Sequence, residues 1–171
     1  MSVLGELQPN KVFKYFEEIC SIPHGSRNLQ QISDYLVDFA KAHELKYRQD
    51  EDLNVIIWKD GSKGYEASEP VILQGHMDMV AVKEADCDKN MEKEGLDLEI
   101  NGDYISAKGT SLGGDDGIAV AYTLAVLDDE EMAHPPIEAI FTVNEEIGML
   151  GAATIDVSDL KGRLFMNMDS E

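Results

Sequence analysis

The sequence is poor in cysteine, proline and basic residues. Its 171 residues include 2 cysteines and 5 prolines, and 14 basic side chains stand against 34 acidic ones, for a formal net charge of −20 at pH 7. Two cysteines far apart in the chain are too few for a disulfide framework or a thiolate zinc site. We therefore expect Cys20 and Cys87 to be reduced thiols.

The sequence also lacks an apolar run that approaches the roughly 20 residues of a membrane span, and it has no basic N-terminal stretch typical of a signal peptide. Its charge of −20 repels phosphate backbones and anionic lipid headgroups. We expect a cytoplasmic protein that binds neither nucleic acid nor membranes, with cations as its natural partners. The composition, 43% hydrophobic and 28% charged, is that of a globular domain rather than a disordered tail.

Helical and extended patterns alternate along the chain. Apolar residues at intervals of three and four predict helices over residues 9–20, 29–43 and 118–127, with a short one at 149–153. Short apolar runs predict strands at 53–58, 71–74, 137–143 and 164–168, and Asn101-Gly102 predicts a hairpin with a type I′ turn. Residues 82–99 are polar and are expected to form a solvated loop. The alternation favours one α/β domain over residues 1–171, with helices on both faces of a sheet.

Polar residues follow the predicted strands at the positions where open α/β sheets bind ligands. His76 and Asp78 come directly after the run at 71–74, and residues two apart in an extended chain point the same way. A metal-binding imidazole usually donates its other N–H to a carboxylate, so this pair suits a metal site. A structural histidine hydrogen-bonded to a neighbouring acid fits the pair as well.

Three further acidic clusters occupy similar positions. Asp115 and Asp116 lie in a glycine-flanked turn, where they could equally cap a helix. Glu145 and Glu146 follow a buried strand, where adjacent acids repel unless a cation compensates them. Asp169 follows the last predicted strand. Together these residues offer nitrogen and oxygen donors that suit Zn²⁺, Co²⁺ or Mn²⁺.

Five motifs in this order resemble the dinuclear zinc exopeptidases, a family that includes glutamate carboxypeptidase and tripeptide aminopeptidase. The motifs are Cys20-Ser21-Ile22-Pro23-His24, Gly75-His76-Met77-Asp78-Met79-Val80, Gly109-Thr110-Ser111-Leu112-Gly113-Gly114-Asp115-Asp116-Gly117, Thr142-Val143-Asn144-Glu145-Glu146-Ile147-Gly148-Met149 and Met168-Asp169-Ser170-Glu171. The resemblance implies a three-layer α/β/α domain with a central mixed sheet. It also implies hydrolysis of small peptides by two zinc ions, with Co²⁺ or Mn²⁺ as alternatives.

The resemblance assigns a role to each acidic or histidine residue of the motifs. It implies that His76 and Asp169 bind one metal, that Glu146 binds the other, and that Asp115 bridges both. Glu145 would be the general base and acid, and Asp78 would orient His76. The family also has a cis peptide bond after the bridging aspartate, here Asp115-Asp116.

Two departures refine this interpretation. Gly117 stands where the wider family usually has lysine, as in the Xaa-His dipeptidase branch. The family's last ligand is a histidine far downstream, after a lid and dimerisation domain, and His24, His43 and His134 do not match it. The resemblance therefore covers an N-terminal part of the catalytic domain. It implies an active, homodimeric full-length dipeptidase and a fragment with little or no activity of its own.

Two other readings stay open. Residues 86–90 imitate the start of a calcium-binding EF-hand loop, although Met91 replaces the required glycine and Asp97 the final glutamate. The chain could also be a non-catalytic remnant that keeps the fold for protein interaction.

Overall fold

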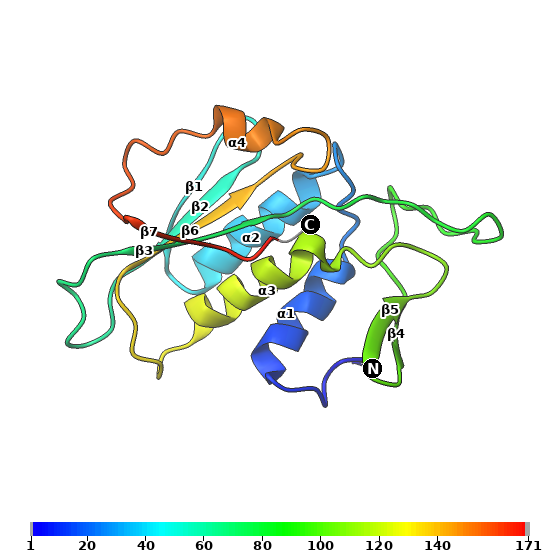
Figure 1. Ribbon diagram of the computed structural model, residues 1–171, viewed down its shortest axis with the longest axis horizontal. Helices are drawn as coiled ribbons and strands as arrows, with labels where there is room; N and C mark the ends of the chain where they lie inside the picture. The colour runs from blue at the N-terminus through cyan, green and yellow to red at the C-terminus, as the bar shows by residue number, and fades with distance from the viewer. Residues whose placement is uncertain (1, 170–171) are drawn as a thin grey trace.

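The chain folds around a five-stranded mixed sheet in a computed structural model that describes residues 2–169 (Figure 1). The strands follow the order β1-β2-β6-β3-β7 across the sheet. Their bounds are Lys46–Gln49 for β1, Val55–Lys59 for β2, Ile137–Thr142 for β6, Val71–His76 for β3 and Leu164–Asn167 for β7. β3 is parallel to both β6 and β7, so these three strands end at the same edge of the sheet.

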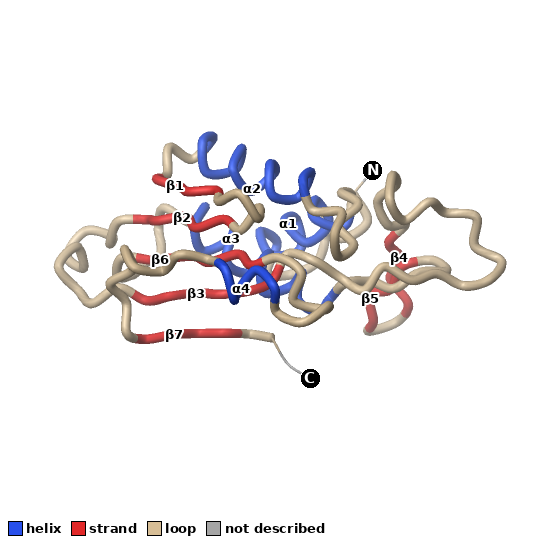
Figure 2. The backbone as a smooth tube through the Cα atoms, turned by 90° about the horizontal axis from the view of Figure 1, so that it is seen from above, coloured by secondary structure: helices blue, strands red, loops and turns tan. Residues whose placement is uncertain are grey.

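Three helices cover one face of the sheet and one short helix lies on the other (Figures 1 and 2). The three are α1 (Asn10–Cys20), α2 (Gln30–Ala42) and α3 (Gly114–Asp128), and the short one is α4 (Leu150–Thr154). The predicted α/β/α arrangement around a mixed sheet is confirmed. Each predicted helix and strand is present, with bounds that differ from the prediction by a few residues.

α1 and α3 pack closely because their contact combines a large side chain with a small one. Phe16 of α1 is 2% exposed. Gly117 of α3 lies so near that a Cβ atom there would be 3.3 Å from the Phe16 ring. A larger residue at position 117 would push against this ring, so the glycine helps to set how closely the first turn of α3 approaches the core.

A separate two-stranded sheet, β4 (Leu98–Asn101) and β5 (Tyr104–Ala107), confirms the predicted hairpin but not its turn. Asn101 pairs with Tyr104, so Gly102 and Asp103 are the two loop residues. Of these two, Gly102 alone has a positive φ, 63°. A type I′ turn needs positive φ at both central positions, whereas type II′ needs it at the first. The predicted type I′ turn at Asn101-Gly102 is therefore wrong, because Asn101 stays in the strand.

One edge strand of the main sheet is polar and the other is apolar. No strand was predicted over β1, whose sequence KYRQ carries no apolar run. At the opposite edge, Leu164, Phe165 and Met166 of β7 are each about half exposed. No helix within residues 2–169 is long and apolar enough to cross a membrane.

Candidate metal centre

The parallel pairing of β3 with β6 brings two of the predicted polar clusters together. His76 at the end of β3 is in register with Thr142 at the end of β6, and the Met77 N–H donates to the Thr142 carbonyl over 2.9 Å. The residues that follow each strand therefore leave the sheet side by side. α3 begins at the same edge, where the His76 N–H donates to Asp116 Oδ2 over 3.1 Å.

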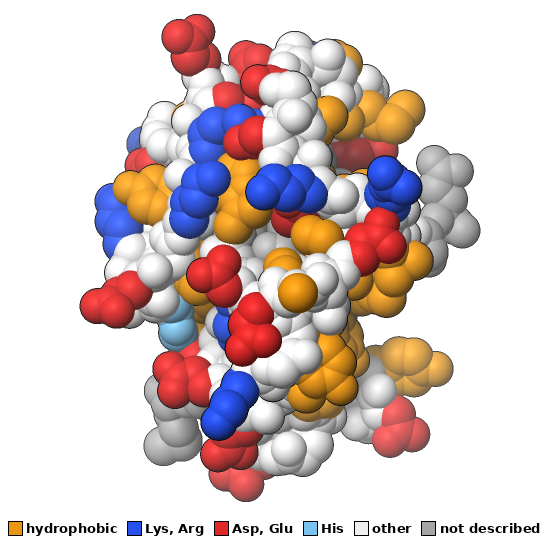
Figure 3. Space-filling view, turned by 90° about the vertical axis from the view of Figure 1, so that its left-hand side faces the viewer, with side chains coloured by type: hydrophobic (Ala, Val, Ile, Leu, Met, Phe, Trp, Pro, Cys, Tyr) orange, Lys and Arg blue, Asp and Glu red, His pale blue; other side chains and the backbone are white. Residues whose placement is uncertain are grey.

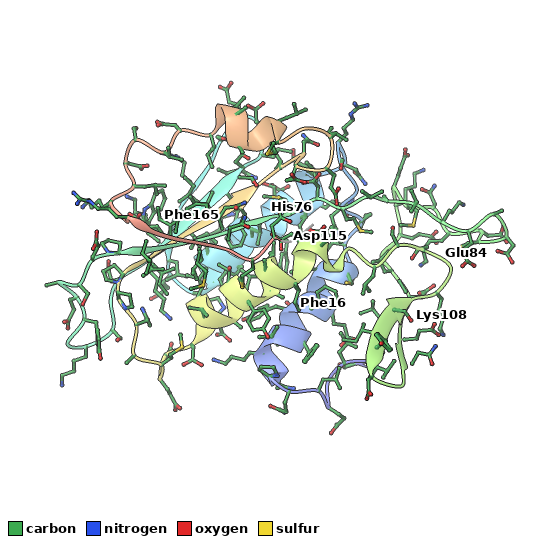
Figure 4. All side chains as sticks on the ribbon, in the orientation of Figure 1. Phe16, His76, Glu84, Lys108, Asp115 and Phe165 are labelled. Carbon is green, nitrogen blue, oxygen red and sulfur yellow. The ribbon has the colours of Figure 1, made fainter. Side chains whose placement is uncertain are left out.

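Three of the predicted ligands meet at this edge. His76, Asp115 and Glu146 each offer a ligand atom, and these atoms all lie within 4.8 Å of one another. Nε2 of His76 is 3.2 Å from Oδ1 of Asp115, and the two side chains lie together at the centre of Figure 4. One imidazole nitrogen and two carboxylates form a donor set that suits zinc and similar divalent ions.

Asp78 lies beneath this group and is 1% exposed. Its Oδ1 accepts the backbone N–H of Glu145 over 3.0 Å, and its Oδ2 accepts the hydroxyl of Ser26 over 2.7 Å. Nδ1 of His76 is 2.9 Å from the Asp78 carbonyl oxygen and 3.6 Å from Oδ1. A proton on Nδ1 satisfies these acceptors and leaves Nε2, which faces Asp115, as the nitrogen that would bind a metal once its own proton is lost.

The charges of His76 and Asp78 support each other. Burial by itself lowers the pKa of His76, but the hydrogen bond and charge of Asp78 outweigh it and raise the pKa to about 9. Burial also works against the Asp78 carboxylate, yet His76, the Glu145 N–H and Ser26 hold its pKa below the usual value. At neutral pH the metal-free pair is therefore an imidazolium and a carboxylate.

The remaining acids of the site are crowded. Burial, with the nearby Asp169 and Asp115, raises the pKa of Asp116 to about 7. Burial and the negative charges of Asp115 and Glu145 also raise the pKa of Glu146. Carboxylates this close together repel one another, and a bound proton lowers this repulsion. A divalent cation between them would do the same.

Gly75 allows α3 to approach β3 this closely. A Cβ atom at position 75 would lie 2.8 Å from Asp116 Oδ2 and 3.0 Å from the Cβ of Ala119. Asp116 therefore reaches the His76 N–H only because residue 75 has no side chain. The Asp115-Asp116 peptide bond is cis, as the resemblance implied.

Glu145 and Asp169 lie near the three ligands but outside their group. Oε2 of Glu145 is 3.8 Å from His76 Nε2, and its side chain is 30% exposed. Asp169 is half-buried, and with Glu145 it lines a hollow of about 230 Å³ on the α4 side of the sheet. Its role as a ligand stays a prediction. Ser170 and Glu171, the end of the last motif, lie outside the described residues.

Two residues make contacts at the site that the sequence did not predict. Ser26, which donates to Asp78, is 52 residues away from it in the chain. Asn144 adopts a left-handed conformation, with φ 54°, and its Oδ1 accepts the Arg27 N–H over 2.8 Å across a separation of 117 residues. The loop after α1 thus holds both Asp78 and the segment that carries Glu145 and Glu146.

The calcium hypothesis finds no support in this structure. Residues 77–97 are described throughout and form an irregular segment between β3 and β4, with no helix on either side of the EF-hand-like run. Nor do the acids of this run form a ligand group in the described part of the chain.

Comparisons with known proteins give relatives that share this fold. The chain is 39% identical, over all of its 171 residues, to 35% of the cytosol non-specific dipeptidase of Escherichia coli K12. The crystal structure of aminoacylhistidine dipeptidase from Vibrio alginolyticus superposes on 98% of the chain with a TM-score of 0.94 and 39% identity, and 34% of that protein is matched.

More distant relatives share the fold. A tripeptidase from Staphylococcus aureus superposes on 98% of the chain with a TM-score of 0.78 at 23% identity, and 45% of that protein is matched. No protein-family model matches the sequence. The chain spans about a third of the length of its dipeptidase relatives. Over its whole length the chain resembles, in sequence and in fold, an N-terminal part of these dipeptidases.

Proposed function

We propose that the protein that carries this chain is a metal-dependent dipeptidase of broad or Xaa-His specificity, and that this chain supplies its general base and most of its metal ligands. The observation that carries the proposal is the group of His76, Asp115 and Glu146, with Glu145 beside it. Two similar proteins, a cytosol non-specific dipeptidase and an aminoacylhistidine dipeptidase, support the substrate class and a cytoplasmic location.

The residues fit a pair of zinc ions that share one carboxylate. His76 with Asp169 would hold one ion and Glu146 the other, and the more exposed Asp115 would bridge them. Co²⁺ and Mn²⁺ suit the same donors. Two zinc ions, when bound, would lower the pKa of a water molecule and polarise the scissile carbonyl.

Glu145 is placed to move the proton in this reaction. Its carboxylate is outside the ligand group yet within reach of it, and its backbone is held by Asp78. It would take a proton from the attacking water as the water oxygen bonds to the carbonyl carbon. It would then give the proton to the amine nitrogen as the C–N bond breaks.

A metal titration of the purified chain tests the site directly. We expect Co²⁺ to bind and to produce a visible absorption band, and we expect Glu146→Gln to weaken this binding by about tenfold or more. Glu145→Gln is the matched control, because it makes the same chemical change one residue away and should leave Co²⁺ affinity almost unaltered. Absence of binding, or equal loss in both variants, would contradict the proposed ligands.

We also propose that this chain has little or no dipeptidase activity by itself and that the full-length enzyme is a homodimer. A shared two-metal site needs more protein ligands than the three that meet among residues 2–169. Incubation of the chain with carnosine-like Xaa-His dipeptides and Zn²⁺ tests the first statement. Robust turnover that depends on Glu145 would mean that this chain completes the site unaided.

A further inference from the structure

A second cavity lies beside the loop that follows α1, and Ser26, which donates to Asp78, is one of its lining residues. Its volume is about 900 Å³, and it is lined by residues 25–28 on one side and by parts of residues 81–93 on the other. Figure 4 places Glu84, in the second of these segments, well to the right of His76. The charged lining residues are four cations and two acids, namely Arg27, Lys83, Lys89, Lys93, Asp88 and Glu92.

Three of the four cations have no carboxylate partner. Within residues 2–169, Lys89 is the one that forms an ion pair, with Asp97 at 3.0 Å, whereas no carboxylate oxygen lies within 4.0 Å of the charged groups of Arg27, Lys83 and Lys93. This is unexpected in a chain with 34 acids and 14 bases. At the opposite end of the molecule, basic side chains stand among acidic ones (Figure 3).

The walls of the cavity are tied to each other and to the metal centre. The Asn28 side chain donates to the Glu92 carbonyl over 2.9 Å, and Lys83 Nζ donates to the Lys89 carbonyl over 2.8 Å. Arg27 has a left-handed backbone, with φ 71°, and its N–H is bound by Asn144, the residue before Glu145. Such a conformation costs free energy outside glycine, and strained residues of this kind cluster at binding and catalytic sites.

We propose that this cavity is a binding site for a small anion that carries carboxylate or phosphate groups and contacts Arg27, Lys83 and Lys93. Arg27, Lys83 and Lys93 are exposed and line one cavity without a carboxylate partner, so they repel one another, and an anion among them relieves this repulsion and gains charge-assisted hydrogen bonds. The volume is typical of a small-molecule site. The net charge of −20 still disfavours an extended polyanion, whose other charges would lie against the acidic surface.

Calorimetric titration of the metal-free chain tests this site without relying on any peptidase activity. The two probes are inorganic phosphate and succinate, each at the same ionic strength in the presence of EDTA. The triple variant Arg27→Gln, Lys83→Gln and Lys93→Gln removes the three unpaired cations. The control triple variant removes the same charge from exposed lysines outside the cavity, Lys14→Gln, Lys63→Gln and Lys108→Gln.

We expect saturable binding of at least one probe, weakened by about tenfold or more in the cavity variant and less than about twofold in the control. Binding of phosphate alone or of succinate alone identifies the anionic group. The single variant Arg27→Gln keeps the backbone N–H that Asn144 binds and should also weaken binding in a folded protein. No saturable binding of either probe, or equal weakening in the two triple variants, would overturn the proposal.

Discussion

The buried pair of His76 and Asp78 predicts how the stability of the metal-free chain depends on pH. Both side chains are 1% exposed, and Asp78 raises the pKa of His76 from the ordinary 6.5 to about 9 against the effect of burial. A shift of this size corresponds to on the order of 3 kcal/mol of folding free energy. The substitution Asp78→Asn keeps the shape of the side chain and removes its charge.

The sign of the effect follows from the direction of the shift. Because the pKa of His76 is higher in the folded than in the unfolded chain, its stabilisation is complete below about pH 6.5 and is lost as the pH rises through about 9. In Asp78→Asn, burial acts on His76 without the opposing carboxylate. We therefore expect the stability difference between wild type and variant to be about 3 kcal/mol larger near pH 6 than above about pH 9.5, where the loss of the charged acceptor for Ser26 and Glu145 remains.

Denaturant unfolding in EDTA across this pH range measures the difference, and an NMR titration of the His76 ring measures its pKa directly. The charge of His76 lowers the pKa of Asp116, so the titration of Asp116 is followed in both proteins and its contribution to the difference is subtracted. The control is Asp88→Asn, an exposed acid whose loss should not alter the pH profile. A stability difference that does not change with pH, or a wild-type His76 that titrates near 6.5, would refute this reasoning.

Three further substitutions separate the metal site from the core. Ser26→Ala removes the hydroxyl that donates to Asp78, so it should lower the free energy of unfolding by about 1.5–3 kcal/mol and weaken Co²⁺ binding. Ser26→Thr should restore both, and an unchanged Co²⁺ affinity in Ser26→Ala would contradict the positioning role of Ser26. Gly75→Ala should displace Asp116 and alter the cobalt absorption spectrum. An unaltered spectrum would mean that α3 shifts to make room for the methyl group without disturbing the site. Phe16→Ala should destabilise the fold by about 3–5 kcal/mol in denaturant unfolding yet leave Co²⁺ affinity nearly unchanged, and a large loss of affinity would show that the core and the site are coupled.

Much of the fold could be predicted because its signals are local. Helical periodicity marks α1 and α2, which bury one face, and short apolar runs mark β2, β3 and β6, which are buried on both faces. These patterns are visible in the sequence because burial depends on residue type. β1 was missed because an edge strand with the sequence KYRQ has no apolar pattern, and its place is decided by pairing with β2. The type of the β4–β5 turn was wrong because register, a property of two strands, decides which residues form the loop.

The candidate site shows the same division. His76, Asp115 and Glu146 were predicted from motifs, since each follows a strand or begins a helix in a recognisable pattern. The contacts of Ser26 with Asp78 and of Asn144 with Arg27 were not predicted, because each joins residues that are distant in the chain. The sequence around a loop serine does not indicate which distant carboxylate its hydroxyl will contact.

The sequence by itself determined the class of fold, the expected donor residues and the strong excess of negative charge, because these follow from composition, periodicity and local motifs. Only the tertiary structure decided that β3 and β6 end side by side, that Gly75 lets Asp116 reach the His76 N–H, and that Arg27 lines one cavity with lysines from a distant loop. The physical reason is that affinity, pKa and charge balance depend on distances of a few ångströms, and chain packing sets those distances.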